Sequence, residues 1–158
     1  MFFHNLKFDG SFITDYLVRN GYVYINQKET PRPNTFTCLI SDNNWFTVTI
    51  YGDYERKKNG EPRLVRGKHK IKEYTIQDSS KKIPVSVKEA AKAYGLDVLK
   101  GELDYDLYRP VGHTLTDDER LYISHDVGII AKVLRLFIVD QNMDKLTISS
   151  DAMANYKK

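Results

Sequence analysis

Apolar residues near the start of the chain change from a strand-like to a helical spacing. Phe2 and Phe3 open the chain as the end of a strand would. From about Asp9 to Asn20 the spacing predicts an amphipathic helix, and Asn20-Gly21 is a typical helix stop. The apolar face of this helix is predicted to contain Phe12, Ile13, Tyr16 and Leu17.

The middle of the chain has the composition and alternation of β-structure. A short strand is expected at 22–25. The β-branched and aromatic runs 35–41 and 45–51, joined by Asp42-Asn43-Asn44, predict a hairpin. Asn59-Gly60 is a second turn signal, after which 70–76 should return as another strand.

Beyond residue 80 the spacing becomes helical. A short helix is predicted at 85–94, ended by Gly95. Thr116-x-x-Glu119 is a capping box, in which the hydroxyl and the carboxylate satisfy backbone N–H groups at a helix start. It should open a long helix to about Asn142, and a last helix is expected near Ser149. This order of elements predicts a mixed α/β fold.

Composition narrows the class of protein. The 158 residues, 41% hydrophobic and 28% charged, fit one globular domain rather than a disordered chain. No stretch approaches the ~20 apolar residues of a membrane span, and residues 1–5 do not resemble a signal peptide. The single cysteine, Cys38, allows no internal disulfide, which favours a reducing, cytoplasmic location. No Cys or His cluster suggests a zinc site.

Charge is concentrated in one segment. Residues 55–72 contain eight Lys and Arg against Glu55 and Glu61, so this segment carries +6 and the rest of the chain −3, giving the net +3. A local basic stripe favours a polyanionic partner, whereas a solvated hairpin explains the same charges without one. Both interpretations remain open from charge alone.

Two acidic residues are candidates for chemistry. Asp9 follows a strand-to-helix turn, where a carboxylate can hold a metal, although capping the helix is the commoner role of Asp there. Tyr122 and Asp126 are four residues apart on one helix face, a sensible pair for hydrolysis. An Asp on a solvated face is the alternative, but Ile123 and Ile130 predict a mostly buried helix, in which a carboxylate needs a partner.

A loop at about residue 100 is the third candidate. Lys100 lies beside Gly101, so it can approach a phosphate closely, and Tyr105 can stack on a base. Taken alone, such a segment is more often an ordinary loop.

Together these segments resemble a known family. Residues 4–10, His-Asn-Leu-Lys-Phe-Asp-Gly, resemble the second exonuclease motif of family B DNA polymerases, and Tyr122-x-x-x-Asp126 resembles the third. Leu99-Lys100-Gly101 with Tyr105, followed by Arg-Pro-Val-Gly at 109–112, is similar to the subgroup that starts replication from a protein primer in phages and linear plasmids. The resemblance covers nearly the whole chain and is weakest at 27–74.

The resemblance implies a DNA-directed DNA polymerase with a 3′→5′ proofreading exonuclease. It implies a ribonuclease H-like exonuclease fold with an inserted basic β-hairpin region and two Mg²⁺ or Mn²⁺ ions. By the same resemblance Asp9 and Asp126 are metal ligands, Tyr122 positions the attacking water, and Lys100 assists at the scissile phosphate. The residues that it assigns to the single-stranded 3′ end are His4, Asn5, Phe8, Phe12, Ser79 and Tyr105. For Phe12, packing in the core is the competing role.

The chain departs from the family pattern at its start. The first motif of the family, Asp-x-Glu, should precede Asn5, and neither Asp53-Tyr54-Glu55 nor Asp117-Asp118-Glu119 can replace it. We therefore expect a single partial, N-terminally truncated exonuclease domain over 1–158, with half a metal site and slow cleavage by the isolated chain. Its parts would be 1–21 with the second motif, 22–78 with the hairpins, and 79–158 with the third motif.

Two hypotheses follow for function. In the first, the chain is part of a polymerase whose polymerisation domain is a partner, together with the terminal-protein primer, in the host cytoplasm. In the second, it is a non-catalytic module that binds single-stranded DNA or a replication protein.

Overall fold

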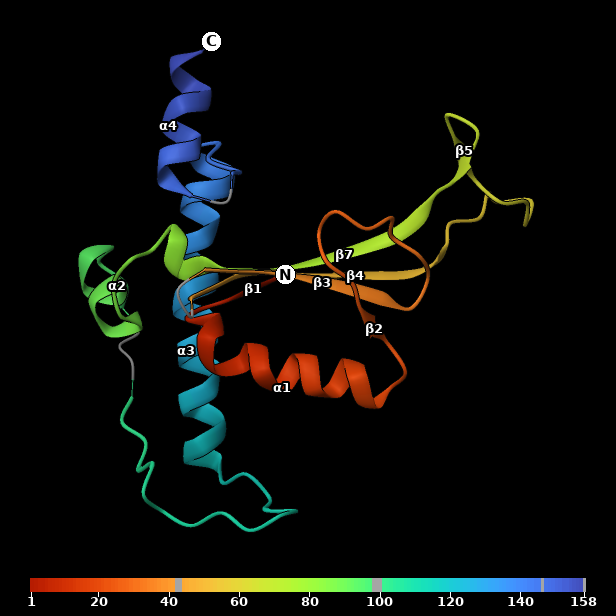
Figure 1. Ribbon diagram of the computed structural model, residues 1–158. Helices are drawn as coiled ribbons and strands as arrows, with labels where there is room; N and C mark the ends of the chain where they lie inside the picture. Colours follow the sequence, from red (N-terminus) through yellow and green to blue (C-terminus); the bar gives the residue numbers. More distant parts are fainter. Residues whose placement is uncertain (42–43, 98–100, 146, 158) are drawn as a thin grey trace. The chain divides into compact units, whose positions relative to one another are not determined.

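The protein has a mixed α/β fold, as predicted, in a computed structural model that describes residues 1–41, 44–97, 101–145 and 147–157. The chain divides into two compact units, Met1–Ser79 and Ser80–Lys158. The first contains the sheet and one helix, and the second contains the remaining helices (Figure 1).

The first unit is built on a five-stranded sheet with the order β1-β7-β4-β3-β2. The central strands β3 (Thr35–Ser41), β4 (Asn44–Tyr54) and β7 (Ile71–Asp78) pair antiparallel, which confirms the predicted hairpin and returning strand. The edge strands β1 (Phe2–Phe3) and β2 (Val23–Tyr24) pair parallel with β7 and β3. The β1–β7 pairing sets Phe3 opposite Asp78 and so brings the turn after β1 to the end of β7.

Helix α1 (Leu6–Arg19) packs against the sheet through one face. Leu6 and Leu17 enter the core, which also contains Phe36, Val48 and Ile76. The helix begins three residues before Asp9, so Asp9 does not occupy the capping position that was the alternative to its metal-binding role. Asn5 occupies the cap position with a left-handed backbone (φ 65°), and its side chain makes no capping bond. Phe12 and Tyr16, which the periodicity placed on the apolar face of this helix, are both exposed, so the core alternative for Phe12 is not borne out.

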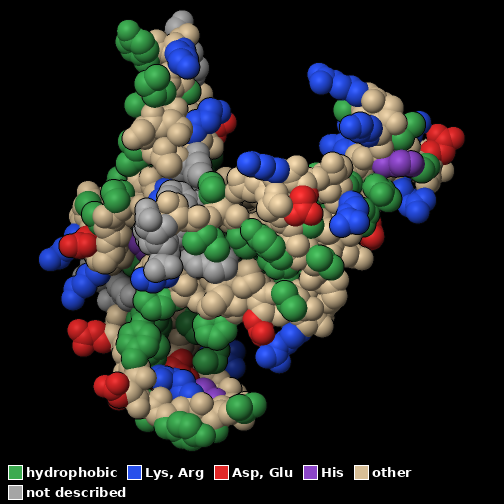
Figure 2. Space-filling view, viewed as in Figure 1, with side chains coloured by type: hydrophobic (Ala, Val, Ile, Leu, Met, Phe, Trp, Pro, Cys, Tyr) green, Lys and Arg blue, Asp and Glu red, His purple; other side chains and the backbone are tan. Residues whose placement is uncertain are grey.

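A ribbon extends from the sheet between β4 and β7. Arg56 and Pro62 form an isolated bridge, and β5 (Leu64–Val65) pairs with β6 (Lys68–His69). The Asn59-Gly60 turn is confirmed by the bond from the Gly60 N–H to the Lys57 carbonyl (3.0 Å). Residues 56–69 are all exposed, and Lys and Arg side chains gather on this ribbon (Figure 2).

The second unit is helical. After the turn η1 (Ser79–Lys81) at the junction come α2 (Val87–Ala93), α3 (Asp117–Arg135), the π-helical turn η2 (Leu136–Asp140) and α4 (Ile148–Tyr156). Capping boxes open both α2 and α3, the second being the predicted Thr116–Glu119 pair. Helices α2 and α3 pack together, and Ile129, Val133 and Ala90 are buried. Ile123 was expected to be buried but is exposed, whereas Ile130 is buried as predicted. No helix in the described part of the chain is long and apolar enough to cross a membrane.

Candidate functional site

The turn between β1 and α1 is braced by the end of β7. The Asn5 N–H donates to Asp78 Oδ1 (3.0 Å), and His4 Nδ1 lies 3.1 Å from Ser79 Oγ. The Ser79 hydroxyl also donates to the Phe3 carbonyl (3.0 Å). These long-range bonds stabilise the left-handed Asn5 backbone, which a non-glycine residue adopts only at some cost. Three of the predicted DNA-binding residues, His4, Asn5 and Ser79, are therefore brought together.

Ser79 is less accessible to solvent than His4 and Asn5. Its side chain is fully buried, and its hydroxyl is used in the bonds to His4 and Phe3, so in this structure it supports the turn rather than presenting a group to solvent. Asn5, in contrast, is exposed and His4 is half-buried.

Asp9 lies in the first turns of α1, half-buried beside this turn. Burial raises the pKa of its carboxyl above the ordinary value, and a hydrogen bond from its own backbone opposes the rise. Partial burial disfavours the charged form, which a nearby cation would restore. On either side of Asp9, Phe8 and Phe12 expose their rings. Phe12 is thus available for binding, as the resemblance implied, and not part of the core.

Tyr122 and Asp126 lie one turn apart on α3. The Tyr122 side chain is buried, and its hydroxyl is 2.6 Å from the hydroxyl of Tyr105, with the two rings edge to face at 6.5 Å. Asp126 is half-buried, with Oδ1 shielded from solvent. The structure thus brings together the tyrosine of the third motif and the tyrosine of the preceding loop, a contact that sequence spacing did not predict.

A cluster around Glu119 holds the loop that carries Tyr105. The buried Glu119 carboxylate accepts from Arg109 Nε (2.6 Å), lies 2.8 Å from His113 Nε2, and caps α3 through the Thr116 N–H. Arg109 also donates to the carbonyls of Leu107 and Asp104, each at 3.0 Å.

Hydrogen bonds from His113, Thr116 and Arg109 lower the pKa of Glu119 to about 2. The sequence identified Glu119 as a cap, but the capping pattern alone does not show its contacts with Arg109 and His113. The only signal for them was that an arginine and a histidine precede the capping carboxylate by ten and six residues.

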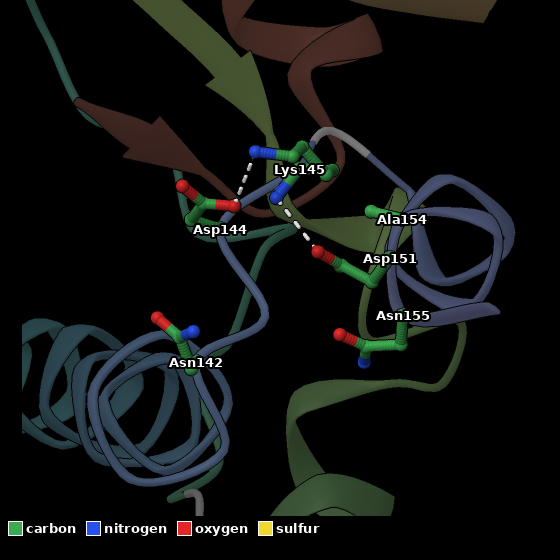
Figure 3. A pocket seen from close by; sticks show the side chains of 6 residues that line it. All are labelled: Asn142, Asp144, Lys145, Asp151, Ala154 and Asn155. Atoms are coloured by element: carbon green, nitrogen blue, oxygen red, sulfur yellow. Dashed lines mark hydrogen bonds and ion pairs between the residues drawn. The ribbon is translucent and has the colours of Figure 1, made fainter. Parts of the chain in front are cut away.

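Lys100 was predicted to contact a phosphate and lies outside the described residues. At the C-terminal end, Asn142, Asp144, Lys145, Asp151, Ala154 and Asn155 line a pocket (Figure 3). There the Lys145 N–H donates to Asp151 Oδ1 (2.8 Å), so the Asp151 carboxylate has a structural role.

Carboxylate oxygens are the ligands that Mg²⁺ and Mn²⁺ prefer. The predicted ligand Asp9 belongs to the first unit and the predicted ligand Asp126 to the second, and each is placed only within its own unit. Among the residues that the structure describes, no three or more His, Cys, Asp or Glu gather as a metal-binding group.

The order of these motifs on a mixed α/β fold points to family B of the DNA polymerases. The family model for DNA polymerase type B, organellar and viral, matches residues 1–113. The chain belongs to this family, and the resemblance found in the sequence is confirmed.

The chain is also similar to the DNA polymerases of several phages. The DNA polymerase of Bacillus phage phi29 is 40% identical over 158 residues, and that of Bacillus phage PZA is also 40% identical. Both matches cover 99% of this chain, and the chain spans about a quarter of the length of these relatives. The DNA polymerase of Streptococcus phage Cp-1 is 24% identical over 160 residues and 22% of its own length.

Solved structures show the same fold. The phi29 DNA polymerase complexed with single-stranded DNA has a TM-score of 0.82 and 39% identity, over 99% of this chain and 25% of that one. The ternary complex of the same polymerase with primer-template DNA and incoming nucleotides has a TM-score of 0.82 and 38% identity over the same shares.

Proposed function

We propose that this chain contributes the 3′→5′ proofreading exonuclease of a protein-primed phage-type DNA polymerase and holds the single-stranded 3′ end. The proposal includes a ribonuclease H-like exonuclease fold with the basic ribbon as an insertion. It rests on family membership together with two local sites, one around Asp9 on α1 and one around Tyr122 on α3.

The observation that carries the proposal is the contact between the hydroxyl of Tyr122, on the third motif, and the hydroxyl of Tyr105, in the preceding loop. Tyr122 lies one turn before Asp126, and its hydroxyl is held by that of Tyr105 at 2.6 Å. A phenol fixed in this way next to a carboxylate can orient a water molecule for attack on a phosphodiester.

Asp9 and Asp126 are the residues that would hold Mg²⁺ or Mn²⁺. When bound, the ions would supply Lewis-acid stabilisation of the attacking and leaving oxygens. The donor chemistry fits, since both groups are carboxylates and both are half-buried. The raised pKa of Asp9 also fits, because a bound cation would favour the ionised form. Lys100 is proposed to assist at the phosphate.

The strand would be held by groups that surround these carboxylates. Phe8 and Phe12 present rings to solvent beside Asp9, and Tyr105 is also exposed. Aromatic rings bind single-stranded DNA by stacking on bases of any sequence. His4 and Asn5 supply polar groups at the start of α1, and the phi29 polymerase, whose fold this chain shares, has been solved with single-stranded DNA.

The similarity to phage DNA polymerases also supports a proposal for the partners and the location of this chain. The remaining three quarters of the relatives' length would supply the polymerisation domain, and a terminal-protein primer would be a further partner. The site of action would be the cytoplasm of an infected host cell.

Binding and cleavage are tested separately. Fluorescence anisotropy of the 158-residue chain with single-stranded and duplex oligonucleotides measures binding, which should favour the single strand. Cleavage is measured on 3′-labelled single strands with Mg²⁺ or Mn²⁺ in the polymerase that carries this chain. Asp126→Asn should abolish it, whereas Asp140→Asn, an exposed acid on η2, should not. Equal cleavage by both variants would contradict the proposal.

A non-catalytic module that binds single-stranded DNA is the second candidate. It is favoured by the exposed aromatic residues of α1, which can bind a strand without metal. Under this alternative Asp126→Asn would leave both binding and the cleavage rate of the polymerase unchanged.

A further inference from the structure

The outer face of α1 has three exposed aromatic rings at a spacing of four residues. Phe8, Phe12 and Tyr16 are 67%, 76% and 65% exposed, whereas Leu6 and Leu17 on the opposite face are buried. Residues four apart lie on one helix face, so the three rings form a row. We call Phe8, Phe12 and Tyr16 the aromatic row.

The spacing of the row suits bases inserted between its rings. Four residues advance an α-helix by about 6 Å, which separates successive rings along the axis. Stacked bases lie about 3.4 Å apart, so one base between two rings needs about 6.8 Å. Small rotations of the side chains cover the difference. A duplex, whose bases already stack on each other, could not enter the row.

The chemistry of the row favours bases over a protein partner. All three members are aromatic, whereas Val18, the other large exposed apolar side chain of α1, points to a different side of the helix. Helices that dock into protein grooves carry apolar anchors at i, i+3, i+4 and i+7, whereas the positions three and seven residues after Phe8 are the polar Ser11 and Asp15. Asp9, the proposed metal ligand, lies between the first two members of the row, Phe8 and Phe12, in the sequence.

At the Tyr16 end of the aromatic row, one positive and one negative side chain form an ion pair. Arg19 Nε lies 2.8 Å from Asp15 Oδ2, and both side chains are exposed. This pair offers no excess charge to attract phosphates. Binding at the Tyr16 end must therefore come from stacking, which depends little on salt.

We infer that Tyr16 is a third base-stacking position, which extends the path of single-stranded DNA along α1 by one nucleotide beyond Phe12. The inference rests on the proposed function, in which Phe8 and Phe12 hold an unpaired strand. It assigns a role to a residue that the periodicity placed on the apolar face of the predicted helix.

The test measures the affinity of the 158-residue chain for oligothymidylates of two to eight nucleotides at several salt concentrations. Tyr16→Leu removes the ring and keeps an apolar side chain, and Tyr16→Trp keeps a ring. Tyr156→Leu is the matched control, since Tyr156 is exposed on α4. Circular dichroism verifies that each variant is folded.

We expect Tyr16→Leu to match the wild type on the shortest oligomers and to lose affinity once the strand reaches its position. The loss should be about 5- to 150-fold, the range for one stacked base, and should persist at high salt. Tyr16→Trp and Tyr156→Leu should behave like the wild type.

Three results would overturn the inference. If Phe12→Leu weakens binding and Tyr16→Leu does not at any length, the row ends at Phe12 while the proposed function stands. A loss with Tyr16→Leu that is equal at every length, or that disappears at high salt, would show a general or electrostatic effect. If the wild type binds no oligothymidylate at all, both the inference and the proposed function fail.

Discussion

Lys82 Nζ lies 2.5 Å from Asp151 Oδ2, and the two side chains are only 1% and 3% exposed. Lys82 also donates to the Met143 carbonyl (2.8 Å), and Asp151 accepts from the Lys145 N–H on its other oxygen (2.8 Å). This ion pair thus ties α4, near the end of the chain, to the segment between η1 and α2. Figure 3 shows Asp151 projecting from α4 toward Lys145.

Removing one member of this pair should destabilise the second unit strongly. Lys82→Met or Asp151→Asn leaves a buried charge without its partner, which costs about 3–5 kcal/mol. Urea unfolding measured by circular dichroism checks this. Asp144→Asn, which removes the exposed pair with Lys145, should change the free energy of unfolding by less than about 1 kcal/mol.

The double variant Lys82→Met/Asp151→Leu separates pairing from packing. Because no lone charge remains buried, it should be more stable than either single variant. Additive losses in the double variant would show that the two side chains stabilise the unit independently.

Glu119 should stabilise the Tyr105 loop in a pH-dependent way. Bonds from His113, Thr116 and Arg109 lower its pKa from 4.5 to about 2. A lowered folded-state pKa stabilises the fold above pH 4.5, and this contribution is lost as the pH falls toward about 2. Glu119→Gln should therefore be less stable than the wild type at neutral pH, and the difference should shrink in acid.

Hydrogen exchange localises the effect of Glu119. Residues 104–113 should exchange faster in Glu119→Gln, because Arg109 would lose the carboxylate that fixes it between the Leu107 and Asp104 carbonyls. Glu89→Gln, which weakens the capping box of α2, is the matched control and should leave this loop unchanged. A loop that stays protected without Glu119 would contradict the role assigned to the cluster.

Local patterns predicted the elements well where local chemistry decides them. The hairpin of β3 and β4 follows from alternating β-branched and aromatic residues, and the start of α3 follows from the Thr116–Glu119 box. The start of α1 could not be predicted in this way. There Asn5 adopts its left-handed backbone through a bond to Asp78, a residue 73 positions away.

The candidate site was predicted only in part, again because local patterns do not show contacts between distant residues. The family motifs identified Asp9, Tyr122 and Asp126, but the contacts between elements were not visible. Periodicity placed Phe12 and Tyr16 on the apolar face of the helix, with the core as one of two roles left open for Phe12. Both side chains are exposed, since much of any protein surface is apolar. No local pattern indicated the buried ion pair between Lys82 and Asp151, because it depends on the fold bringing two residues 69 positions apart together.

The bond between the Tyr105 and Tyr122 hydroxyls should matter more for cleavage than for folding. Tyr122→Phe removes the hydroxyl proposed to orient water, and a misplaced nucleophile costs about 10²-fold in rate. Tyr105→Phe breaks the same bond but keeps that hydroxyl, so its loss of rate should be smaller. Rates on 3′-labelled single strands, in the polymerase that carries this chain, check the order. Equal losses would indicate that only the bond matters.

The basic ribbon allows a quantitative choice between a polyanion-binding surface and a solvated hairpin. Some of its cations are already paired, since Glu55 binds Arg63 and Lys70, and Glu61 binds Lys57. Among the cations of the ribbon that remain exposed, Lys58, Arg66 and Lys68 are the best placed to meet phosphates, because no ion pair within the described chain engages them.

Each phosphate contact lowers the slope of log affinity against log salt by about 0.7 for a single strand. The triple variant Lys58→Gln/Arg66→Gln/Lys68→Gln should therefore flatten the slope by about 2 if all three bind phosphates. Lys88→Gln/Lys92→Gln, which neutralises two exposed lysines of α2, is the control and should leave the slope unchanged. An unchanged slope in the triple variant would establish the ribbon as a solvated hairpin, since charges that release no counterions contact no DNA.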